Sequence, residues 1–434
     1  MKKIAIVSHG CAKNLIDSEL MFGLLSDAGF KISLDDENAD IVIVNTCSFI
    51  CDAERESVQS ILELINAGKK VIVTGCLAQK HASELKNAVP EISAIVGTTD
   101  FTELCKVLEK VEKGEYVEMV NPKPDYIYPE NINRAQITMG ASSYLKIAEG
   151  CNYRCGYCII PYLRGDFHSR PIENILNEAK SLADKGVSEI ILIAQDTSYY
   201  GIDLYRKPML AELLKQLNEI PNINWIRIMY THPAMINDEL LDAIANLEKV
   251  VKYIDIPLQH SHPDMLKRMN RPDFDYREMI SKMRSKIPNL AIRTSFVVGY
   301  PGETEEEFEH LYNFIKDIKF DRVGVFQYSR EKGTPSYAMK PQVLAKVKKE
   351  RHKKLMLLQQ GISLERNKAF IGKIVPCIIE GYSDNGEVVA RTQFDAPEVD
   401  GVVAIKTEEP VVPGDIEMVK IIAADEYDLT GEIV

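Results

Sequence analysis

Three cysteines occur within eight residues in the segment AEGCNYRCGYCIIP, at Cys151, Cys155 and Cys158. The segment directly follows a short apolar run that is typical of a buried strand. Three thiolates this close together can coordinate three corners of a four-iron cluster and leave the fourth iron without a protein ligand. An iron with an open position can bind a small molecule, so the spacing predicts a reactive metal site in the middle of the chain.

Zinc and a redox dithiol are the alternatives for these cysteines. Structural zinc requires four ligands, but a second CxxC pair or a suitably spaced histidine pair is missing, and His168 is the only nearby candidate. A redox dithiol explains only two of the three cysteines. An iron-sulfur cluster therefore accounts best for the set, with zinc as its main competitor.

The cysteines as a whole indicate a reducing compartment. The chain has 434 residues and nine cysteines, an odd number spread along its length rather than packed into a short secreted frame. Its start, MKKIAIVSHGCAKN, turns polar by Ser8, too early for a signal-peptide core, and no run of about eighteen apolar residues occurs. We therefore expect a cytoplasmic protein without a membrane segment. The net charge of -12 disfavours indiscriminate attraction to polyphosphates.

Residues 1–113 alternate short apolar runs with amphipathic stretches, which predicts a doubly wound α/β domain. The expected strands are residues 4–7, 41–44, 71–73 and 94–96, and the expected helices are residues 15–25, 53–65 and 82–88. The whole chain is thus predicted to be a multidomain α/β protein, because further domains follow this one.

A second cysteine set follows the predicted strands of this domain, with Cys11, Cys47 and Cys76 each just beyond one strand. Because the carboxyl ends of parallel strands gather at one edge of a sheet, we expect these three distant cysteines to converge. The alternative is three unrelated buried thiols, since free cysteine is often buried. Equivalent placement at three strand ends favours a site. Cys51, four residues after Cys47, is a possible competing ligand.

Residues 114–135 contain NPKPDYIYPEN, with three prolines and no periodicity, and are predicted to be a linker. Residues 136–368 return to an α/β rhythm, with six expected strands at 144–147, 190–193, 225–229, 253–256, 294–298 and 323–326. Six βα units indicate a partial, open (β/α)6 barrel. Thr304 and Glu307 form a capping box that predicts a helix start after the fifth strand.

The last part of this region predicts a long helix, and a different pattern follows it. The helix carries Lys348, Lys349, Lys353 and Lys354 on one face, which we interpret as a solvated surface. Residues 369–434 change to short alternating strands separated by turn signals such as Asp384-Asn385-Gly386. This pattern predicts a small β-barrel.

The central motif is similar to that of the radical-SAM superfamily, a CxxxCxxC with an aromatic residue, here Tyr157, before the last cysteine. The resemblance implies a 4Fe-4S cluster on Cys151, Cys155 and Cys158 whose open iron chelates S-adenosyl-L-methionine (SAM). One electron from the cluster then splits a carbon-sulfur bond and yields a radical that removes hydrogen from an unreactive carbon.

The same resemblance implies further cofactor contacts. The expected contacts besides Tyr157 are Gln259 near the ribose, and Gly299 and Gly302, in the segment GYPGE, beside the adenine. The alternative for the two glycines is that they only shape a βα turn. Arg164 and Arg170 are candidates for contacting the substrate or the SAM carboxylate. No catalytic residue is assigned beyond the cluster ligands.

The likeness extends over essentially the whole chain, through SHGCAKNLIDSE, VNTCSFI, VTGCLAQ, the central motif and the final barrel. This combination resembles the methylthiotransferases, a radical-SAM branch with an N-terminal α/β domain and a C-terminal TRAM barrel. The resemblance implies that Cys11, Cys47 and Cys76 hold an auxiliary 4Fe-4S cluster. It also implies that two SAM molecules are used, one for the radical and one for the methyl group attached to the inserted sulfur.

Two branches of that family differ in substrate, an adenosine of tRNA or the β-carbon of an aspartate in ribosomal small-subunit protein twelve. Residues 370–434 contain four basic residues against fourteen acidic ones, a net charge of -10. A module that binds the phosphates of tRNA should be basic, whereas an acidic module is expected to bind a basic ribosomal protein. The segment RTQFDAPEVDG also resembles the protein-modifying branch. We therefore expect the ribosomal protein, with an electron donor as a further partner, and regard tRNA as the alternative.

A function of another class is also open, namely a non-catalytic iron-sulfur electron carrier or a metal-stabilised binding protein. It predicts bound iron without cleavage of SAM, so the two classes are separable by experiment.

Overall fold

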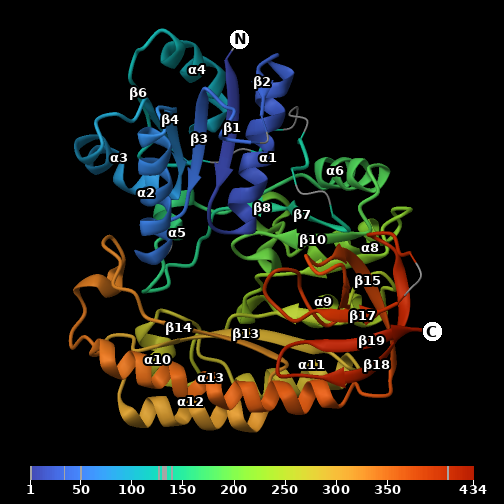
Figure 1. Cartoon of the computed structure of the whole chain (residues 1–434). Coiled ribbons are helices and arrows are strands. Elements are labelled where there is room, and N and C mark those ends of the chain that lie inside the picture. The colour runs from blue at the N-terminus through green and yellow to red at the C-terminus, as the bar shows by residue number, and fades with distance from the viewer. Residues whose placement is uncertain are drawn as a thin grey trace.

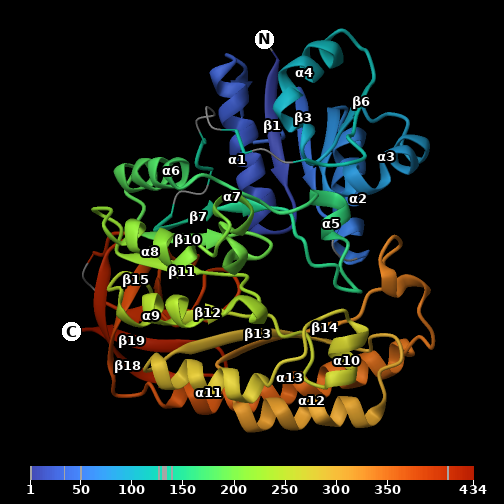
Figure 2. The same ribbon diagram turned by 180° about the vertical axis from the view of Figure 1, so that it is seen from behind.

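The computed structural model describes residues 2–33, 35–48, 51–125, 128–129, 134–137, 140–407 and 410–434. The chain forms three parts in sequence order, as Figures 1 and 2 show: an N-terminal α/β domain, a central partial barrel and a small C-terminal barrel packed beside it. This arrangement confirms the predicted fold class.

The first domain is built on a six-stranded sheet in the order β2-β1-β3-β4-β5-β6, and all of its strand pairs are parallel. The strands are β1 (Lys3–Ser8), β2 (Lys31–Ile32), β3 (Ile41–Thr46), β4 (Lys70–Gly75), β5 (Ala94–Val96) and β6 (Val117–Met119). The four predicted strands are present because each is a continuous apolar run buried on both faces. Strand β6 lies within residues 114–135, the segment expected to be a linker, and extends the sheet there.

Helices cover both faces of this sheet, as expected for a doubly wound fold. They are α1 (Ala12–Asp27), α2 (Cys51–Asn66), α3 (Cys76–Ala88) and α4 (Leu104–Glu112), with a short 3-10 helix η1 (Asp100–Glu103). Apolar residues of α1 and α4 share one core with the sheet, and those of α2 and α3 share the other. Helix α1 is buried along most of its length because the central barrel packs against its outer side.

The six predicted strands of the central region are all present and form two parallel three-stranded sheets, β11-β10-β7 and β12-β13-β14. Their bounds are β7 (Ser142–Lys146), β10 (Glu189–Ile193), β11 (Trp225–Ile228), β12 (Tyr253–Asp255), β13 (Ala291–Val298) and β14 (Arg322–Gln327). A bridge between Ile226 and Val250 joins the two halves into an open, partial barrel. A two-stranded pair, β8 (Ala148–Glu149) and β9 (His168–Ser169), flanks the cysteine loop.

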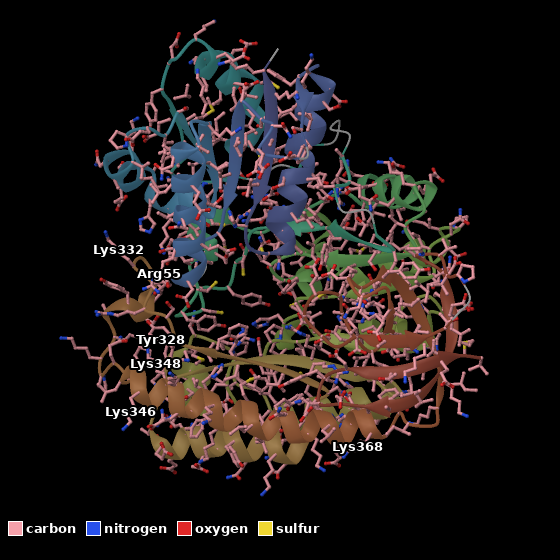
Figure 3. All side chains as sticks on the ribbon, in the orientation of Figure 1. Arg55, Tyr328, Lys332, Lys346, Lys348 and Lys368 are labelled. Carbon is pink, nitrogen blue, oxygen red and sulfur yellow. The ribbon has the colours of Figure 1, made fainter. Side chains whose placement is uncertain are left out.

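Helices accompany this barrel; most cover its outside, whereas α5 packs against the first domain. They are α5 (Ile160–Arg164), α6 (Ile172–Asp184), α7 (Ile202–Tyr205), α8 (Leu210–Asn218), α9 (Asp238–Asn246), α10 (Pro263–Arg268), α11 (Tyr276–Lys286), α12 (Glu305–Ile318) and α13 (Ala345–Lys368), with the 3-10 helices η2 (Thr197–Tyr199), η3 (Pro233–Met235) and η4 (Pro335–Ala338). The capping box of Thr304 and Glu307 begins α12, as predicted. Helix α13 is the long helix; Lys348 on it donates to the carbonyl of Tyr328 at 2.8 Å, and Figure 3 shows the two side by side. Part of its basic face is therefore packed rather than solvated.

The C-terminal strands close into a five-stranded barrel in the order β15-β16-β17-β19-β18. They are β15 (Ile374–Tyr382), β16 (Val388–Thr392), β17 (Val403–Lys406), β18 (Ile416–Ala424) and β19 (Leu429–Ile433). Arg391 on β16 pairs with Glu189 on β10, which also accepts from Arg227 at 2.8 Å, and all three side chains are buried. These charges fix the small barrel against the central one.

Among the helices of the described part of the chain, none combines the length and the apolar character needed to cross a bilayer.

Candidate functional site: two cysteine sets at one domain interface

The predicted cysteines of the first domain lie where three neighbouring strands end. The strand order reverses between β1 and β3, and ligands of open α/β sheets bind at such a switch point. Cys11 follows β1, Cys47 follows β3 and Cys76 follows β4. Cys11 is the N-cap of α1 and Cys76 is the first residue of α3, so both thiols lie at helix N-termini. The positive end of a helix dipole favours a thiolate at that position.

A glycine in the left-handed region precedes two of these cysteines and turns the chain sharply from strand to helix. Gly10 has a φ of 96°, and a Cβ there would lie 2.9 Å from Cys47 Sγ. Gly75 has a φ of 88°, and a Cβ there would lie 2.5 Å from the carbonyl oxygen of Thr46. The Gly-Cys pairs are therefore needed for the three strand ends to approach one another.

Two asparagines fasten the strand ends, and sequence reasoning did not single them out. The Asn14 amide donates to the carbonyl oxygens of His9 at 2.9 Å and Thr46 at 3.0 Å. The Asn45 amide donates to the carbonyl oxygen of Asn14 at 2.8 Å and to Ser18 at 3.0 Å. The amides thereby replace missing sheet hydrogen bonds beyond β1 and β3. For Asn45, a polar residue at the end of the apolar run of residues 41–44 was the available signal.

The three thiols influence one another electrostatically. Burial raises the pKa of the Cys76 thiol to about 11; nearby Cys11 and Cys47 add to that increase, whereas Arg164 opposes it. Mutual repulsion of thiolates is relieved when a cation binds them, so the donor set suits a metal centre. Cys51 begins α2, but its side chain lies outside the described part of the structure, and its competition with Cys47 stays a prediction.

The central cysteine loop runs between β8 and α5 and is held by backbone contacts. The amide of Cys151 donates to the carbonyl of Gly165 at 3.1 Å, and that of Cys158 donates to the carbonyl of Cys155 at 3.0 Å. The amide of Gly156 donates to the carbonyl of Met269 at 2.8 Å, and a Cβ at Gly156 would collide with the hydroxyl of Tyr300. The glycine inside the CxxC pair is thus required by close packing.

These three thiols also lie close enough to interact. Burial raises the pKa of Cys158 to about 12, with Cys155 and Cys151 adding to it, and burial raises that of Cys151 to about 12. Arg271 lies 3.9 Å from Cys155 Sγ and supplies a positive charge beside the set. Thiols with such pKa values ionise only when a metal replaces the proton.

The sulfur spacing bears on the choice between zinc and a cluster. In neither cysteine set do all three sulfur atoms lie within 4.8 Å of one another. A tetrahedral zinc ion with Zn–S bonds of about 2.3 Å would bring its thiolates to about 3.8 Å apart. A four-iron cluster holds its thiolates further apart than a single zinc ion does.

The two sets are joined by the segment that follows the central motif. Ile159 and Leu163 pack on Cys76 in one small buried cluster. Arg164, at the end of α5, donates to Cys76 Sγ at 3.6 Å and to Asn14 at 2.6 Å. The chain thus runs from the last central cysteine directly to the cysteines of the first domain.

Buried charges at this interface fix the first domain against the barrel. Asp17 on α1 pairs with Lys146 at 2.5 Å and with Arg164 at 2.6 Å. Glu149 pairs with Lys146 at 2.7 Å, and despite its burial the two cations hold its pKa at about 2. Arg164 is therefore engaged inside the protein. Arg170, its fellow candidate for a substrate contact, pairs with Glu178 at 2.7 Å.

The residues expected to contact SAM are spread around the central cysteines. Tyr157 is half-buried, and Arg271 donates to its hydroxyl at 3.4 Å. Gln259 has a φ of 70°, an uncommon conformation for a residue other than glycine, and its backbone pairs with Ser295 and Val297. Strained backbone of this kind gathers at functional sites. The contact of Tyr157 and Gln259 with SAM stays a prediction.

Gly299 and Gly302 have a structural role of their own. Their φ values are 76° and 78°, which only glycine adopts without strain. The side chain of Lys348 covers Gly299, and Arg268 donates to the carbonyl of Gly302 at 3.0 Å. The turn alone explains why both positions are glycine. Their contact with an adenine stays a prediction.

The segment after β10 places a carboxyl group beside the central cysteines. Asp196 caps η2 through Ser198 and Tyr199, but among the described residues its Oδ2 has no hydrogen-bond partner. Burial raises the pKa of Asp196 to about 6, and its charge in turn raises that of Cys151. Sequence reasoning gave this residue no role, because an aspartate at a strand end resembles an ordinary cap.

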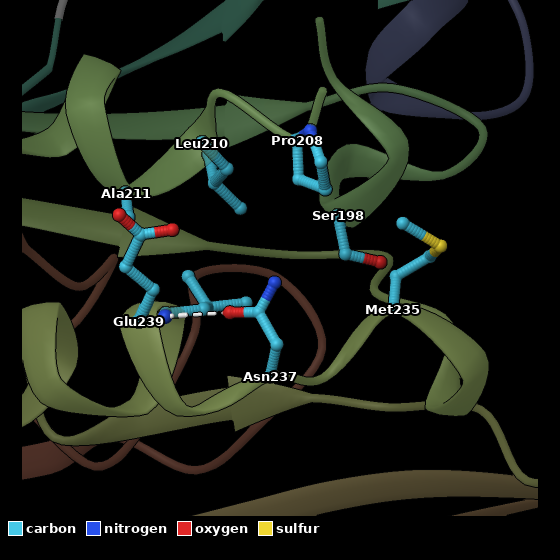
Figure 4. A pocket seen from close by; sticks show the side chains of 8 residues that line it. Ser198, Pro208, Leu210, Ala211, Met235, Asn237 and Glu239 are labelled. Carbon is cyan, nitrogen blue, oxygen red and sulfur yellow. Dashed lines mark hydrogen bonds between the residues drawn. The ribbon is translucent and has the colours of Figure 1, made fainter. Parts of the chain in front are cut away.

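Two hollows lie away from the cysteines. The one in Figure 4, between η2, α8 and α9, has a volume of about 10 Å³, which is room for one water molecule rather than a substrate. A larger cavity of about 280 Å³ lies between the central and C-terminal barrels and is lined by residues that include Tyr144, Glu380, Glu398 and Asp400.

Comparisons with known proteins agree with this division of the chain. Residues 3–97 match the uncharacterized protein family UPF0004, residues 145–315 the radical SAM superfamily and residues 371–434 the TRAM domain. Over 438 residues the chain is 49% identical to the ribosomal protein uS12 methylthiotransferase RimO of Thermoanaerobacter sp. (strain X514), with 100% of each chain covered. It is 48% identical over 435 residues to the protein of that name from Synechococcus sp. (strain JA-2-3B'a(2-13)), covering 99% of this chain and 91% of the relative.

Solved structures support the fold. The radical SAM methyltransferase TsrM from Kitasatospora setae, with cobalamin and a [4Fe-4S] cluster bound, superimposes with a TM-score of 0.55 at 15% identity and covers 77% of each chain. The cobalamin-dependent SAM radical enzyme OxsB gives a TM-score of 0.51 at 11% identity, covering 83% of this chain and 56% of that one. On the strength of its full-length relatives, the chain belongs to the RimO family of methylthiotransferases within the radical SAM superfamily.

Proposed function

We propose that this protein inserts sulfur and a methyl group at the β-carbon of an aspartate in ribosomal small-subunit protein uS12, using two SAM molecules. The observation that carries the proposal is the junction of two three-cysteine sets through Ile159, Leu163 and Arg164, in a chain similar to RimO proteins over its full length. Sulfur insertion requires a sulfur source and a hydrogen-abstracting centre that face one substrate.

In this proposal Cys151, Cys155 and Cys158 hold one four-iron cluster, and Cys11, Cys47 and Cys76 hold a second. When bound, the clusters and SAM supply one-electron chemistry and a transferable sulfur. The chain's own residues position and shield these groups. The helix N-termini at Cys11 and Cys76 favour thiolates, and Arg164 and Arg271 offset their charge.

The acidic C-terminal barrel supports a basic protein substrate over tRNA. Part of its charge is used internally, because Asp395 pairs with Arg322 at 2.5 Å and Asp400 with Arg293 at 3.4 Å. Other acidic side chains are exposed: Asp384, Glu387, Glu398, Asp415, Asp425, Asp428 and Glu432. Such a surface repels phosphate and attracts a polycation. The proposal places the enzyme in the cytoplasm, where ribosomes and an electron donor are available.

The test is modification of purified substrates. Protein reconstituted anaerobically with iron and sulfide is incubated with SAM, a reductant and either small ribosomal subunits or tRNA. We expect the methylthio mass increment on an aspartate of uS12. Methylthiolation of tRNA alone would contradict the substrate, and failure to form 5′-deoxyadenosine in well-loaded protein would favour an electron carrier instead.

The number of clusters is tested by iron analysis of two triple variants. We expect about eight irons in the wild type and about half that number when Cys151, Cys155 and Cys158 are replaced by alanine. Replacing Cys11, Cys47 and Cys76 should remove the other half. Full iron retention in either variant would contradict the assignment of that set.

A further inference from the structure

A lysine lies beside the cysteines of the first domain with its charge buried. Lys13 is in the first turn of α1, two residues after Cys11, and only 9% of it is exposed. Its ammonium lies over the ring of Tyr230, 2.9 Å from the ring centroid, so the side chain reaches from the first domain to the end of β11 in the central barrel.

Lys13 has no carboxylate partner among the described residues. No carboxylate oxygen described there lies within 4.0 Å of its ammonium; its strongest electrostatic neighbour of opposite sign is the thiol of Cys11, followed by Asp255 and Glu149. Both acids are already engaged, Glu149 by Lys146 at 2.7 Å and Asp255 by Arg293 at 3.0 Å. Neither carboxylate is therefore free to pair with Lys13.

The other buried cations of the same interface are paired. Lys146 contacts two carboxylates, Arg134 contacts Glu19 and Glu178, and Arg164 contacts Asp17. A cation in the first turn of a helix is also opposed by the helix dipole, so Lys13 is unfavourable for folding on two counts. A ligand whose carboxylate pairs directly with the ammonium would offset both.

The ring below Lys13 is held in a fixed orientation. Tyr230 has a φ of 61°, which is strained for a residue with a side chain, and its amide donates to Asp255 Oδ2 at 3.0 Å. A ring face attracts an ammonium but does not neutralise its charge. The ring of Tyr230 therefore contacts one side of the Lys13 ammonium. The N–H groups of the ammonium remain available to donate to a ligand.

We propose that Lys13 binds the side-chain carboxylate of the substrate aspartate and so determines that an acidic residue enters the space between the two cysteine sets. This inference rests on the proposed function and adds a substrate-binding residue to it. An ammonium that donates to the carboxylate oxygens holds the adjacent β-carbon beside Cys11 and its neighbours. A charge-assisted hydrogen bond of this kind distinguishes aspartate from its neutral amide.

The test compares two peptides that differ only in the target residue. Dye-labelled uS12 peptides with the aspartate or with asparagine in its place are titrated into cluster-loaded enzyme without reductant, and binding is followed by fluorescence anisotropy. We expect the wild type to prefer the aspartate peptide by about tenfold or more, and Lys13→Met to bind both peptides as weakly as the wild type binds the asparagine peptide. Lys13→Arg should retain part of the preference.

Lys80→Met is the matched control, because Lys80 is a buried lysine of the same interface that already pairs with Glu54 at 2.7 Å and Glu331 at 2.9 Å. It should keep the peptide preference even if it lowers stability. Iron content and the electron paramagnetic resonance of both clusters should be unchanged in Lys13→Met. A preference that survives in Lys13→Met, or is absent in the wild type, overturns the role of Lys13. Failure of the wild type to modify uS12 in intact subunits counts against the proposed function itself.

Discussion

The guanidinium of Arg164 lies 3.6 Å from Cys76 Sγ and 2.6 Å from Asp17 Oδ2, so one side chain connects the loop of the central cysteines to both a thiol and a carboxylate of the first domain. All three groups are buried. Replacing Arg164 removes the only cation that contacts both Cys76 and Asp17 among the described residues, so a variant at this position tests the interface directly.

Arg164→Met should leave Asp17 and Glu149 with one cation instead of two. We expect the free energy of unfolding to fall by about 3–5 kcal/mol, the usual effect of removing one partner from a buried ion pair. Urea unfolding followed by circular dichroism measures it. Arg154→Met is the control, because Arg154 pairs with Asp166 at the surface, and a change there should stay below about 1 kcal/mol. Equal losses in both variants would contradict the role assigned to Arg164.

Gly75→Ala should disrupt the first-domain cysteine site while leaving the central one. The new Cβ would collide with Asn45 and with the carbonyl of Thr46, so the strand end that carries Cys76 must move. We expect iron content after reconstitution to fall by about half. Gly68 also has a positive φ, 76°, but a Cβ there meets nothing within 4 Å, so Gly68→Ala is the control. It should cost only about 1 kcal/mol of strain and keep full iron. Normal iron in Gly75→Ala would refute the packing argument.

Gly156→Ala should have the complementary effect on the central site, because its Cβ would collide with the hydroxyl of Tyr300. Removing that hydroxyl makes room, so Tyr300→Phe in the same chain should restore iron binding to Gly156→Ala. Tyr300→Phe alone loses a hydrogen bond to the carbonyl of Arg268, worth about 1 kcal/mol. The absorbance of the reconstituted clusters reports each variant, and a double variant no better than Gly156→Ala would argue against the collision.

Glu189 predicts a stability that depends on pH. Burial opposes its ionisation, but Arg391 and Arg227 hold its pKa at about 2, below the ordinary value of 4.5. Because the folded-state pKa is lowered, the stabilisation is fully present above pH 4.5 and is lost as the pH falls towards 2. Glu189→Gln should destabilise the protein by about 3 kcal/mol at pH 7, and the difference from wild type should shrink below pH 4.5.

Thermal unfolding at several pH values measures this difference. Glu365→Gln is the control, since Glu365 pairs with Lys319 at the surface and should give no measurable change. A difference between wild type and Glu189→Gln that is independent of pH would show that the ion pair does not set the acid response.

Much of the fold was predictable because most of its strands contain continuous apolar runs, and in the first domain several of these runs end close to a glycine or a cysteine. The capping box at Thr304 was equally clear. Strand β6, VEM, was missed because three residues with a central glutamate carry no apolar signal, and only pairing with β5 makes it a strand. Convergence of Cys11 with its partners followed from parallel strand ends.

The charged interface could not be predicted in the same way. Asp17 and Glu19 have the composition of a solvated helix face, yet α1 is covered on its outer side by the central barrel. Which face of a helix is exposed depends on a domain more than a hundred residues away in sequence. Lys13 was overlooked for the same reason, since its neighbour Tyr230 belongs to that distant domain.

The ion pairs between α1 and the cysteine loop have a consequence for access. Swinging the first domain away from the central barrel would separate the buried pairs of Asp17 with Lys146 and Arg164, so the distance between the two cysteine sets is set when the chain folds. Under the proposed function, a substrate would therefore have to reach both sets as they stand, without a domain movement that brings them together.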